Sequence, residues 1–200
     1  GARISLDFDP SEQSIAFHSI YVVRNGDVEQ RLSADTFTTI RREPDLQSGM
    51  VDGNLTSFTE LTDIRVGDVV GYEYTIGNSG GVWPGGYASQ ISLSWGVPLL
   101  QQHHRVIVPA GTSLNLKPWR EAPAPEIIQS SDRTTYVWEL VNLSPDVSVD
   151  NTPAGYPQQQ SYSLSNMGSW AEVVDWALPL FPGDLPIPAE AQARLETLGQ

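Results

Sequence analysis

The sequence predicts an all-β protein, an antiparallel β-sandwich of about ten to twelve short strands followed by a C-terminal helical connector. Short apolar stretches recur over the first 166 residues, separated by Gly, Pro, Asn and Asp. Several of these stretches alternate apolar and polar residues with a period of two. The period becomes helical only after Ser169. We therefore expect a sandwich domain over residues 1–166 and a connector over residues 167–200.

The first strands are predicted from segments that are rich in apolar residues. Residues 2–4 begin in strand-like sequence, and residues 14–24 are apolar on both faces, which is typical of a strand covered on both sides. Asn25 and Gly26 follow, and they predict a hairpin turn because both residues tolerate positive φ. Further strands are expected over residues 28–32 and 36–42, the second because it is rich in Thr and Phe.

The later strands are predicted by alternation. Residues 69–76 place Val70, Tyr72, Tyr74 and Ile76 on one face. Similar stripes over residues 91–97 and 134–143 include Trp95 and Trp138, so both indoles are expected in the core. Shorter strands are expected over residues 105–108, 113–116 and 161–164.

The C-terminal part carries a helix signature. Ser169 followed three residues later by Glu172 fits a capping box, and Trp170, Val173, Val174 and Ala177 then have helical spacing. Pro179 is expected to end this helix at or before residue 178. The Pro-rich residues 181–188 predict a linker, and a second short helix is expected after it.

Composition excludes several functional classes. With 24 acidic residues against 11 Lys and Arg, the net charge is −13, which disfavours binding to nucleic acids and to anionic membranes. The chain has no run of about 20 apolar residues, so no membrane insertion is expected in this segment. It also has no cysteine, which excludes a disulfide, a thiolate nucleophile and a cysteine-ligated metal.

Motifs of catalysis are weak. Residues 77–81 resemble the loop around a trypsin-type serine, yet His18 is the only upstream histidine, so a glycine-rich hairpin loop is favoured. His18 lies in an expected buried strand and should bond a backbone group. His103 and His104 are adjacent and would point to opposite faces of a strand, which prevents easy chelation of one ion. No catalytic residue, cofactor or metal site is therefore expected.

A binding surface is a second possibility, because several aromatic residues fall outside the apolar stripes. Trp83 and Trp119 are expected in loops, and Tyr87 lies near the first of them. An exposed loop tryptophan can mark a ligand site, although packing over a sheet edge is more common. A charged surface built from Arg41, Glu43 and Asp52 is a weaker alternative. Together these form the candidate binding surface: Trp83, Tyr87, Trp119, Arg41, Glu43 and Asp52.

Several segments together resemble a bacterial family. The resembling segments are residues 8–10, 15–28, 41–43, 52–53, 63–70, 72–75 and 169–176. The family is an uncharacterised β-sandwich domain, a domain of unknown function, found N-terminal to transglutaminase-like catalytic domains in envelope and exported proteins. The resemblance implies that catalysis resides in a following Cys-His-Asp domain and that a further strand precedes Ala2.

The leading hypothesis from this resemblance is a non-catalytic accessory module, which is not itself an enzyme. Its partner would be the transglutaminase-like domain of the same polypeptide, in the periplasm or cell envelope. Trp170 and Trp176 would lie on different faces of the helix, so they are the candidate interdomain contacts. The alternative is a glycan- or peptide-binding module that uses loop aromatics. A hydrolase with paired carboxylates ranks last, because nothing in the sequence pairs them.

Overall fold

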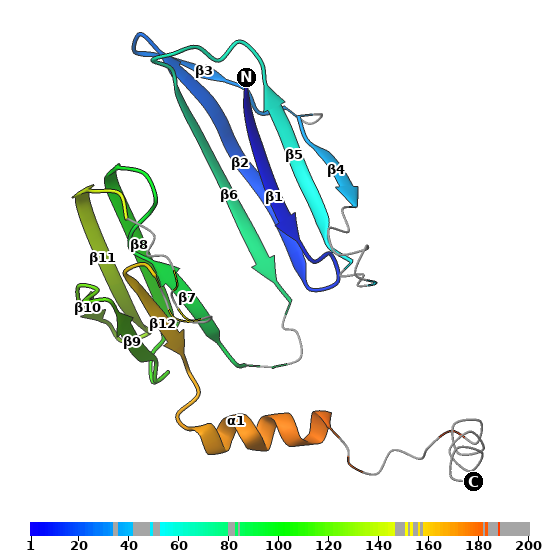
Figure 1. Cartoon of the computed structure of the whole chain (residues 1–200), viewed down its shortest axis with the longest axis vertical. Helices are drawn as coiled ribbons and strands as arrows, with labels where there is room; N and C mark the ends of the chain where they lie inside the picture. The colour runs from blue at the N-terminus through cyan, green and yellow to red at the C-terminus, as the bar shows by residue number, and fades with distance from the viewer. Residues whose placement is uncertain are drawn as a thin grey trace. The chain divides into compact units, whose positions relative to one another are not determined.

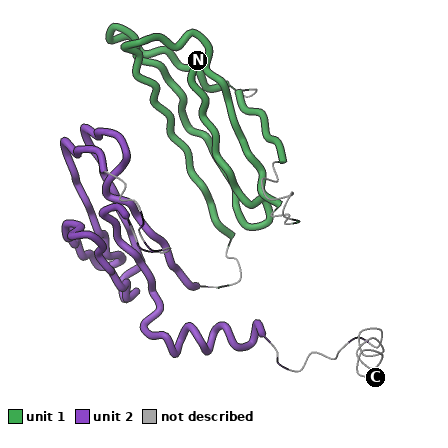
Figure 2. Tube along the Cα trace, viewed as in Figure 1, with its two compact units in different colours: residues 1–84 green, residues 85–200 purple. Residues whose placement is uncertain are grey.

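The computed structural model describes residues 1–33, 36–41, 49, 53–79, 83, 85–146, 151, 153, 156, 158–181, 183 and 188. Within these residues the chain forms twelve strands, one α-helix and one 3₁₀ helix, so the predicted all-β class is confirmed (Figure 1). The chain divides into two compact units, residues 1–84 and residues 85–200 (Figure 2). The connector role of residues 167–200 stays a prediction.

Unit 1 is a sandwich of two three-stranded antiparallel sheets, ordered β1-β5-β4 and β3-β2-β6. Its core joins the two sheets, because Ile4 from β1 and Leu61 from β5 pack with Ile20 from β2. The strands are β1 (Ala2–Phe8), β2 (Gln13–Arg24), β3 (Asp27–Gln30), β4 (Thr38–Arg41), β5 (Leu55–Leu61) and β6 (Val69–Asn78).

The predicted turn after β2 is confirmed. Asn25 and Gly26 have φ values of 52° and 92°, the left-handed conformations that a tight hairpin requires. On its other side β2 pairs with β6, and the register shifts between Phe17 and Ser19, which marks a bulge. The expectation that His18 is buried and bonded to the backbone is wrong. It is exposed at this bulge, and its Nε2 lies 2.7 Å from Thr75 Oγ1.

Unit 2 is also built from two three-stranded antiparallel sheets, ordered β10-β11-β8 and β7-β12-β9. Its core is aromatic: Tyr136 and Trp138 from β11 pack with Tyr162 from β12. The Trp138 and Tyr162 ring centroids are 5.2 Å apart. The strands are β7 (Ala88–Ser92), β8 (Leu99–Pro109), β9 (Asn115–Trp119), β10 (Glu126–Gln129), β11 (Arg133–Leu143) and β12 (Ser161–Ser165).

Of the two tryptophans expected in this core, one is buried and the other is exposed. Trp138 is 1% exposed, and its indole N–H donates to the Pro123 carbonyl at 3.1 Å, so its predicted core position is confirmed. Trp95 is 57% exposed, so its predicted core position is wrong. The reason is that β7 ends at Ser92, earlier than the alternating pattern indicated, and Trp95 falls in the segment that follows.

The predicted helix is confirmed as α1 (Trp170–Ala177), and Pro179 lies in the 3₁₀ helix η2 (Leu178–Leu180) that follows it. The Ser169 hydroxyl accepts the Glu172 backbone N–H at 3.3 Å. The Glu172 carboxylate accepts the backbone N–H of Gly168 at 2.7 Å, one residue before the usual capping-box partner. The capping residues therefore fix where α1 begins.

Candidate functional site

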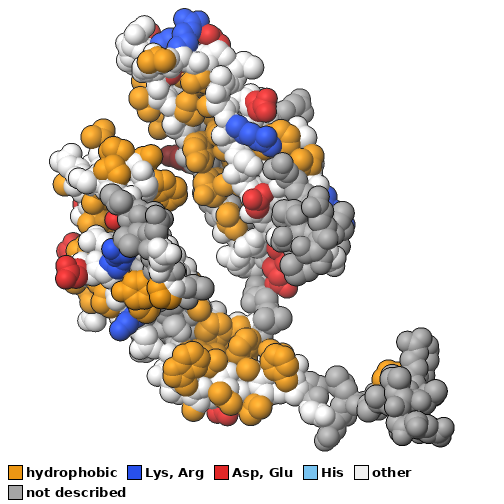
Figure 3. Space-filling view, viewed as in Figure 1, with side chains coloured by type: hydrophobic (Ala, Val, Ile, Leu, Met, Phe, Trp, Pro, Cys, Tyr) orange, Lys and Arg blue, Asp and Glu red, His pale blue; other side chains and the backbone are white. Residues whose placement is uncertain are grey.

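The most conspicuous apolar surface lies on α1 and η2. No residue of either helix is buried, and α1 contacts no strand among the described elements. Trp170 is 83% exposed, and hydrophobic side chains gather along this helix (Figure 3). An exposed apolar cluster of this kind marks an interaction site in a folded protein. We call this cluster the α1 patch: Trp170, Val174, Leu178, Leu180 and Phe181.

A second aromatic cluster surrounds Trp119. This residue ends β9 and is half-buried, so its expected place in a loop is wrong. Its indole N–H donates to Ser163 Oγ at 2.9 Å, and its ring meets Tyr156 edge-on with centroids 6.4 Å apart. The Lys117 ammonium lies 5.5 Å from the Trp119 ring centroid, which is a cation–π distance. The cluster is on the outer face of the β7-β12-β9 sheet.

That outer face carries mostly neutral polar groups. The strand register places Gln90, Ser163 and Lys117 in one row across the three strands. Gln90 also donates its side-chain amide to Ser161 Oγ at 3.0 Å. Within the three strands that the structure describes, no carboxylate lies on this face. In a chain of net charge −13, this face is therefore unusually free of negative charge.

The other members of the candidate binding surface are spread over the chain. Tyr87 lies just before β7 in unit 2, where its backbone N–H donates to Asn166 Oδ1 at 2.8 Å. Trp83 is half-buried and belongs to unit 1, as does Arg41 at the end of β4. Glu43 and Asp52 lie outside the described residues. Within unit 2, Tyr87 and Trp119 lie toward opposite ends of one sheet.

An ion-pair cluster ties the end of β2 to the loop before β6. Arg24 Nε and Nη2 donate to Asp68 at 2.9 and 2.7 Å, and Asp68 also accepts the Arg65 backbone N–H at 2.8 Å. These bonds, with that from Arg24 the strongest, lower the pKa of Asp68 to about 2. Bonds from the Arg65 and then the Arg24 side chains lower the pKa of Asp63 as well. Asp68 therefore pairs with Arg24 at the end of β2.

The adjacent histidines of β8 face opposite sides, as predicted. His103 is exposed and bonds the Glu139 carboxylate, which lowers the pKa of Glu139. His104 is half-buried beside the core, and burial lowers its pKa. Among the described residues its Nε2 has no hydrogen-bond partner, and the same holds for Gln102 Oε1 two residues earlier on the same face. Because the two rings face apart, they do not share a ligand.

The described residues contain no catalytic constellation that we can identify. Ser79 Oγ donates to the Glu12 carbonyl at 3.0 Å, and His18 contacts Thr75 rather than Ser79. Among the described residues, no group of three or more His, Asp or Glu side chains is placed to hold a metal ion. Among the same residues, no helix is long and apolar enough to cross a membrane.

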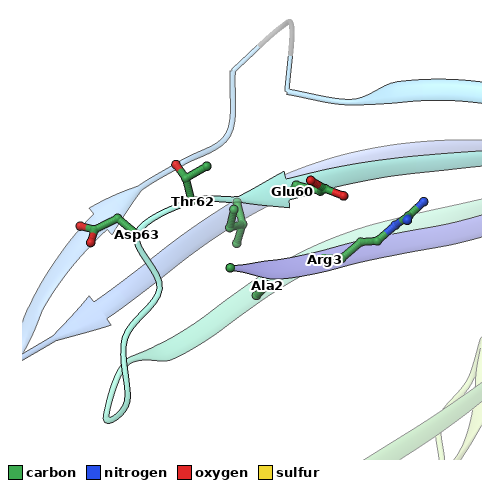
Figure 4. A pocket seen from close by; sticks show the side chains of 7 residues that line it. Ala2, Arg3, Glu60, Thr62 and Asp63 are labelled. Atoms are coloured by element: carbon green, nitrogen blue, oxygen red, sulfur yellow. The ribbon is translucent and has the colours of Figure 1, made fainter.

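One open pocket lies at the end of the β1–β5 ladder (Figure 4). Arg3 and Glu60 are paired in register across these strands, and the Arg3 guanidinium lies 4.3 Å from the Phe58 ring centroid. Asp63, at the pocket rim, is already paired with Arg24 and Arg65. The carboxylates among the residues lining this pocket are Glu60 and Asp63.

Comparison with known proteins agrees with this architecture. A model of the family described as "Domain of Unknown Function with solved-structure structure (DUF3857)" matches residues 1–147. A crystal structure of "a putative protease" from Parabacteroides distasonis is similar in fold, with a TM-score of 0.69 and 16% sequence identity. The match covers 84% of this chain and 33% of that one, so the chain spans a third of its length. A search of curated proteins found no match.

Proposed function

The chain belongs to the DUF3857 family, and from that premise we propose that it is a non-catalytic module of a transglutaminase-like, protease-class protein. It positions a neighbouring catalytic domain of the same polypeptide, in the periplasm or cell envelope. The observation that carries this proposal is the α1 patch, a solvent-facing apolar surface on a well-capped helix.

Exposure of the α1 patch to water is unfavourable in free energy. Burying a large apolar side chain is worth roughly 1.5–3 kcal/mol, and the patch has five such side chains. Ser169 and Glu172 cap the helix, so its start does not depend on packing against a strand. A capped helix with an uncovered apolar surface suits contact with another folded domain. We therefore assign the α1 patch to the interface with the catalytic domain.

The composition of the chain and the similar crystal structure support a non-catalytic module that accompanies a separate catalytic domain. The chain has no cysteine, so the nucleophile of a transglutaminase-like reaction would have to come from another domain. The protein in the similar crystal structure is three times as long as the part matched here and is described as "a putative protease". Both facts are compatible with a module that accompanies a catalytic domain.

The test uses the full-length natural protein and the 200-residue chain side by side. In the full-length protein, Trp170→Ser should lower the melting temperature of the catalytic domain and increase hydrogen exchange in α1. In the 200-residue chain it should change stability little, because Trp170 is exposed there. Trp95→Ser, at another exposed tryptophan, is the matched control. If deleting residues 1–165 changed neither activity nor stability of the full-length protein, the proposal would fail.

A second function, glycan binding, is favoured by the Trp119 cluster. An indole beside a lysine, set among serine and glutamine side chains on an open sheet face, offers stacking and hydrogen bonds to a sugar. Titration with soluble cell-wall fragments should change tryptophan fluorescence in the chain but not in Trp119→Ala. Trp95→Ala should respond as the unmodified chain does. No response across neutral and acidic oligosaccharides would remove this candidate.

A further inference from the structure

The outer strands of unit 1 differ in how they are protected against pairing with other chains. Natural sheets usually shorten an edge strand or place charges on it. β3 and β4 have four residues each, and β3 carries Asp27 and Glu29. β1 carries Arg3 and Asp7. β6 has ten residues, contains no Pro, Lys or Arg, and bears one carboxylate, Glu73.

β6 is hydrogen-bonded on one side only within the described sheets. It pairs with β2 and has no second neighbour in the β3-β2-β6 order. In an antiparallel strand, alternate residues direct their N–H and C=O groups toward each side, so the free side offers a regular row of donors and acceptors. We call the unpaired side of Val69–Asn78 the β6 edge.

The side chains beside the β6 edge are incompletely covered although they face the sandwich interior. Register pairs Tyr72 with Ile20, which is fully buried in the core, so both lie on the inner face. Tyr72 is nevertheless 47% exposed, Tyr74 is 41% exposed and Ile76 is 37% exposed. Hydrophobic side chains are visible along this side of unit 1 (Figure 3). An added strand would cover them.

A series of aromatic rings connects the side chains beside the β6 edge with the interior of the sandwich. Phe37 stacks on Phe17 with centroids 3.5 Å apart, and Phe17 lies 6.4 Å from Tyr74. Tyr74 lies 6.1 Å from Tyr72, with the ring planes within 13° of parallel. The rings therefore form an aromatic row that starts within the sandwich and ends at the β6 edge. A side chain from an added strand would meet the exposed end of this row.

We propose that the β6 edge binds an extended polypeptide strand of a partner, with apolar side chains at alternate positions and basic side chains between them. Only an extended backbone supplies donors and acceptors at the spacing of a sheet edge. The apolar positions would cover the aromatic row, and the basic positions would face Glu73 on the opposite face. Two copies of this chain would each bring a charge of −13, which disfavours self-pairing and favours a basic partner.

The first test measures hydrogen exchange of the 200-residue chain with a defined probe. The probe is a blocked seven-residue peptide of alternating lysine and valine. Its control has N-methylated valines, which cannot donate hydrogen bonds to the sheet. The probe should slow exchange at alternate β6 amides by about tenfold or more at saturation, and the control should not. The proposal would be overturned if the probe left hydrogen exchange unchanged. It would also be overturned if the β6 amides on both sides of the strand were already fully protected in the free monomer.

Variants then separate edge pairing from unspecific binding. Tyr74→Lys interrupts the aromatic row at an exposed position and should weaken probe binding by about tenfold or more. Ile40→Lys, on the outer strand β4 with the same exposure as Ile76, is the control and should leave binding unchanged. Glu73→Lys keeps the apolar row and should weaken binding in a salt-dependent way. Equal binding by Tyr74→Lys and the parent chain would contradict the proposal.

Self-association and the α1 patch are distinguished in the same experiments. A concentration-dependent dimer in sedimentation, with β6 amides protected only in the dimer, would assign the edge to a second copy and overturn the partner proposed here. Trp170→Ser should bind the probe as the parent chain does. The β6 edge and the α1 patch can therefore fail independently.

Discussion

Both units are built from two three-stranded antiparallel sheets, although their strand orders differ, and their cores are stabilised differently. In unit 1 the buried centre is aliphatic and small, with Ile4, Ile20 and Leu61 between the sheets. In unit 2 the centre is aromatic, with Trp138 and Tyr162 in contact across the two sheets. A pair of three-stranded sheets is thus compatible with either kind of core. Among the described residues, the core cluster of unit 1 is the smaller one, so we expect contacts outside it to contribute more to the stability of that unit.

Two such contacts stand out in unit 1. Arg24 connects the end of β2 to Asp68, whose side chain is almost fully buried. Tyr21 lies over Gly71 on the neighbouring strand, where the absence of a side chain makes room for the ring. The first contact lies at the end of β2, and the second lies on the outer face of the β3-β2-β6 sheet. The comparison predicts that unit 2 depends most on one buried side chain and unit 1 on contacts at its rim.

The largest effect is expected for Trp138→Ala. Truncating a fully buried tryptophan costs about 3–5 kcal/mol, and here it also leaves the Pro123 carbonyl without its indole donor. Denaturant titration followed by hydrogen exchange should show unit 2 amides losing protection before unit 1 amides. Trp170→Ala, at an exposed tryptophan, is the control and should change stability by less than about 0.5 kcal/mol. Equal loss of protection in both units would show that they unfold together.

The second-largest loss of stability is expected for Asp68→Asn in unit 1. The Asp68 pKa is about 2, below its ordinary 3.8, so its ionised form stabilises the folded state. That contribution is complete above the ordinary pKa and is lost as the pH falls through about 2. The variant should lower the melting temperature of unit 1 near neutral pH and flatten its acid denaturation curve between about pH 4 and 2. An unchanged acid curve would show that the Arg24 pair does not couple to folding.

A smaller effect is expected for Gly71→Ala. A Cβ atom at Gly71 would lie 2.2 Å from Tyr21 Cζ, so the ring must move off the strand. Overpacking of this kind costs about 1–3 kcal/mol, and the movable ring places this change toward the lower end. Gly77→Ala in the same strand is the control, because its Cβ would meet only Ser14 Oγ, at 2.9 Å. Thermal unfolding should separate the two variants, and equal stability would show that Tyr21 moves without cost.

Sequence patterns predicted the elements whose local chemistry is distinctive. The Asn25-Gly26 turn, the Ser169 cap and the alternating strand around Trp138 were all found where expected. Strand β5 was not predicted, because its buried positions are polar. Thr56 is buried on it and donates to Asp7 Oδ1 at 2.5 Å, so a hydrogen bond takes the place of apolar burial. Hydrophobic periodicity does not detect such a strand.

The candidate surfaces were harder to predict for a related reason. The stripe containing Tyr72 and Tyr74 was correctly expected on one face, but only the strand order shows that β6 is an outer strand. Lys117 is the only lysine of the chain, yet its contact with Trp119 depends on both side chains lying on the same face of β9. Sheet order and face are set by contacts between distant residues. Composition and local spacing therefore singled out Trp119 but gave no signal for its contact with Lys117 or for the β6 edge.

The smallest effect on stability is expected from the protonation of His104 in unit 2. Burial lowers the pKa of His104 below 6.5, and a hydrogen bond to the Ser92 backbone offsets part of that shift. Above about pH 6.5 the ring is neutral in both states, so the stability of unit 2 is at its full value. As the pH falls below this value the unfolded chain binds the proton first, so unit 2 loses stability.

His104→Gln should remove this pH dependence, because glutamine does not titrate in that range. The measurement is hydrogen exchange of unit 2 core amides in the parent and variant chains at pH values on either side of 6.5. Unit 1 amides in the same sample are the internal control, because the Asp68 pair responds only to stronger acid. Lowering the pH would then destabilise the two units one at a time, first unit 2 through its half-buried His104 ring and then unit 1 through its Asp68 ion pair. A parallel loss of protection in both units below pH 6.5 would contradict that separation.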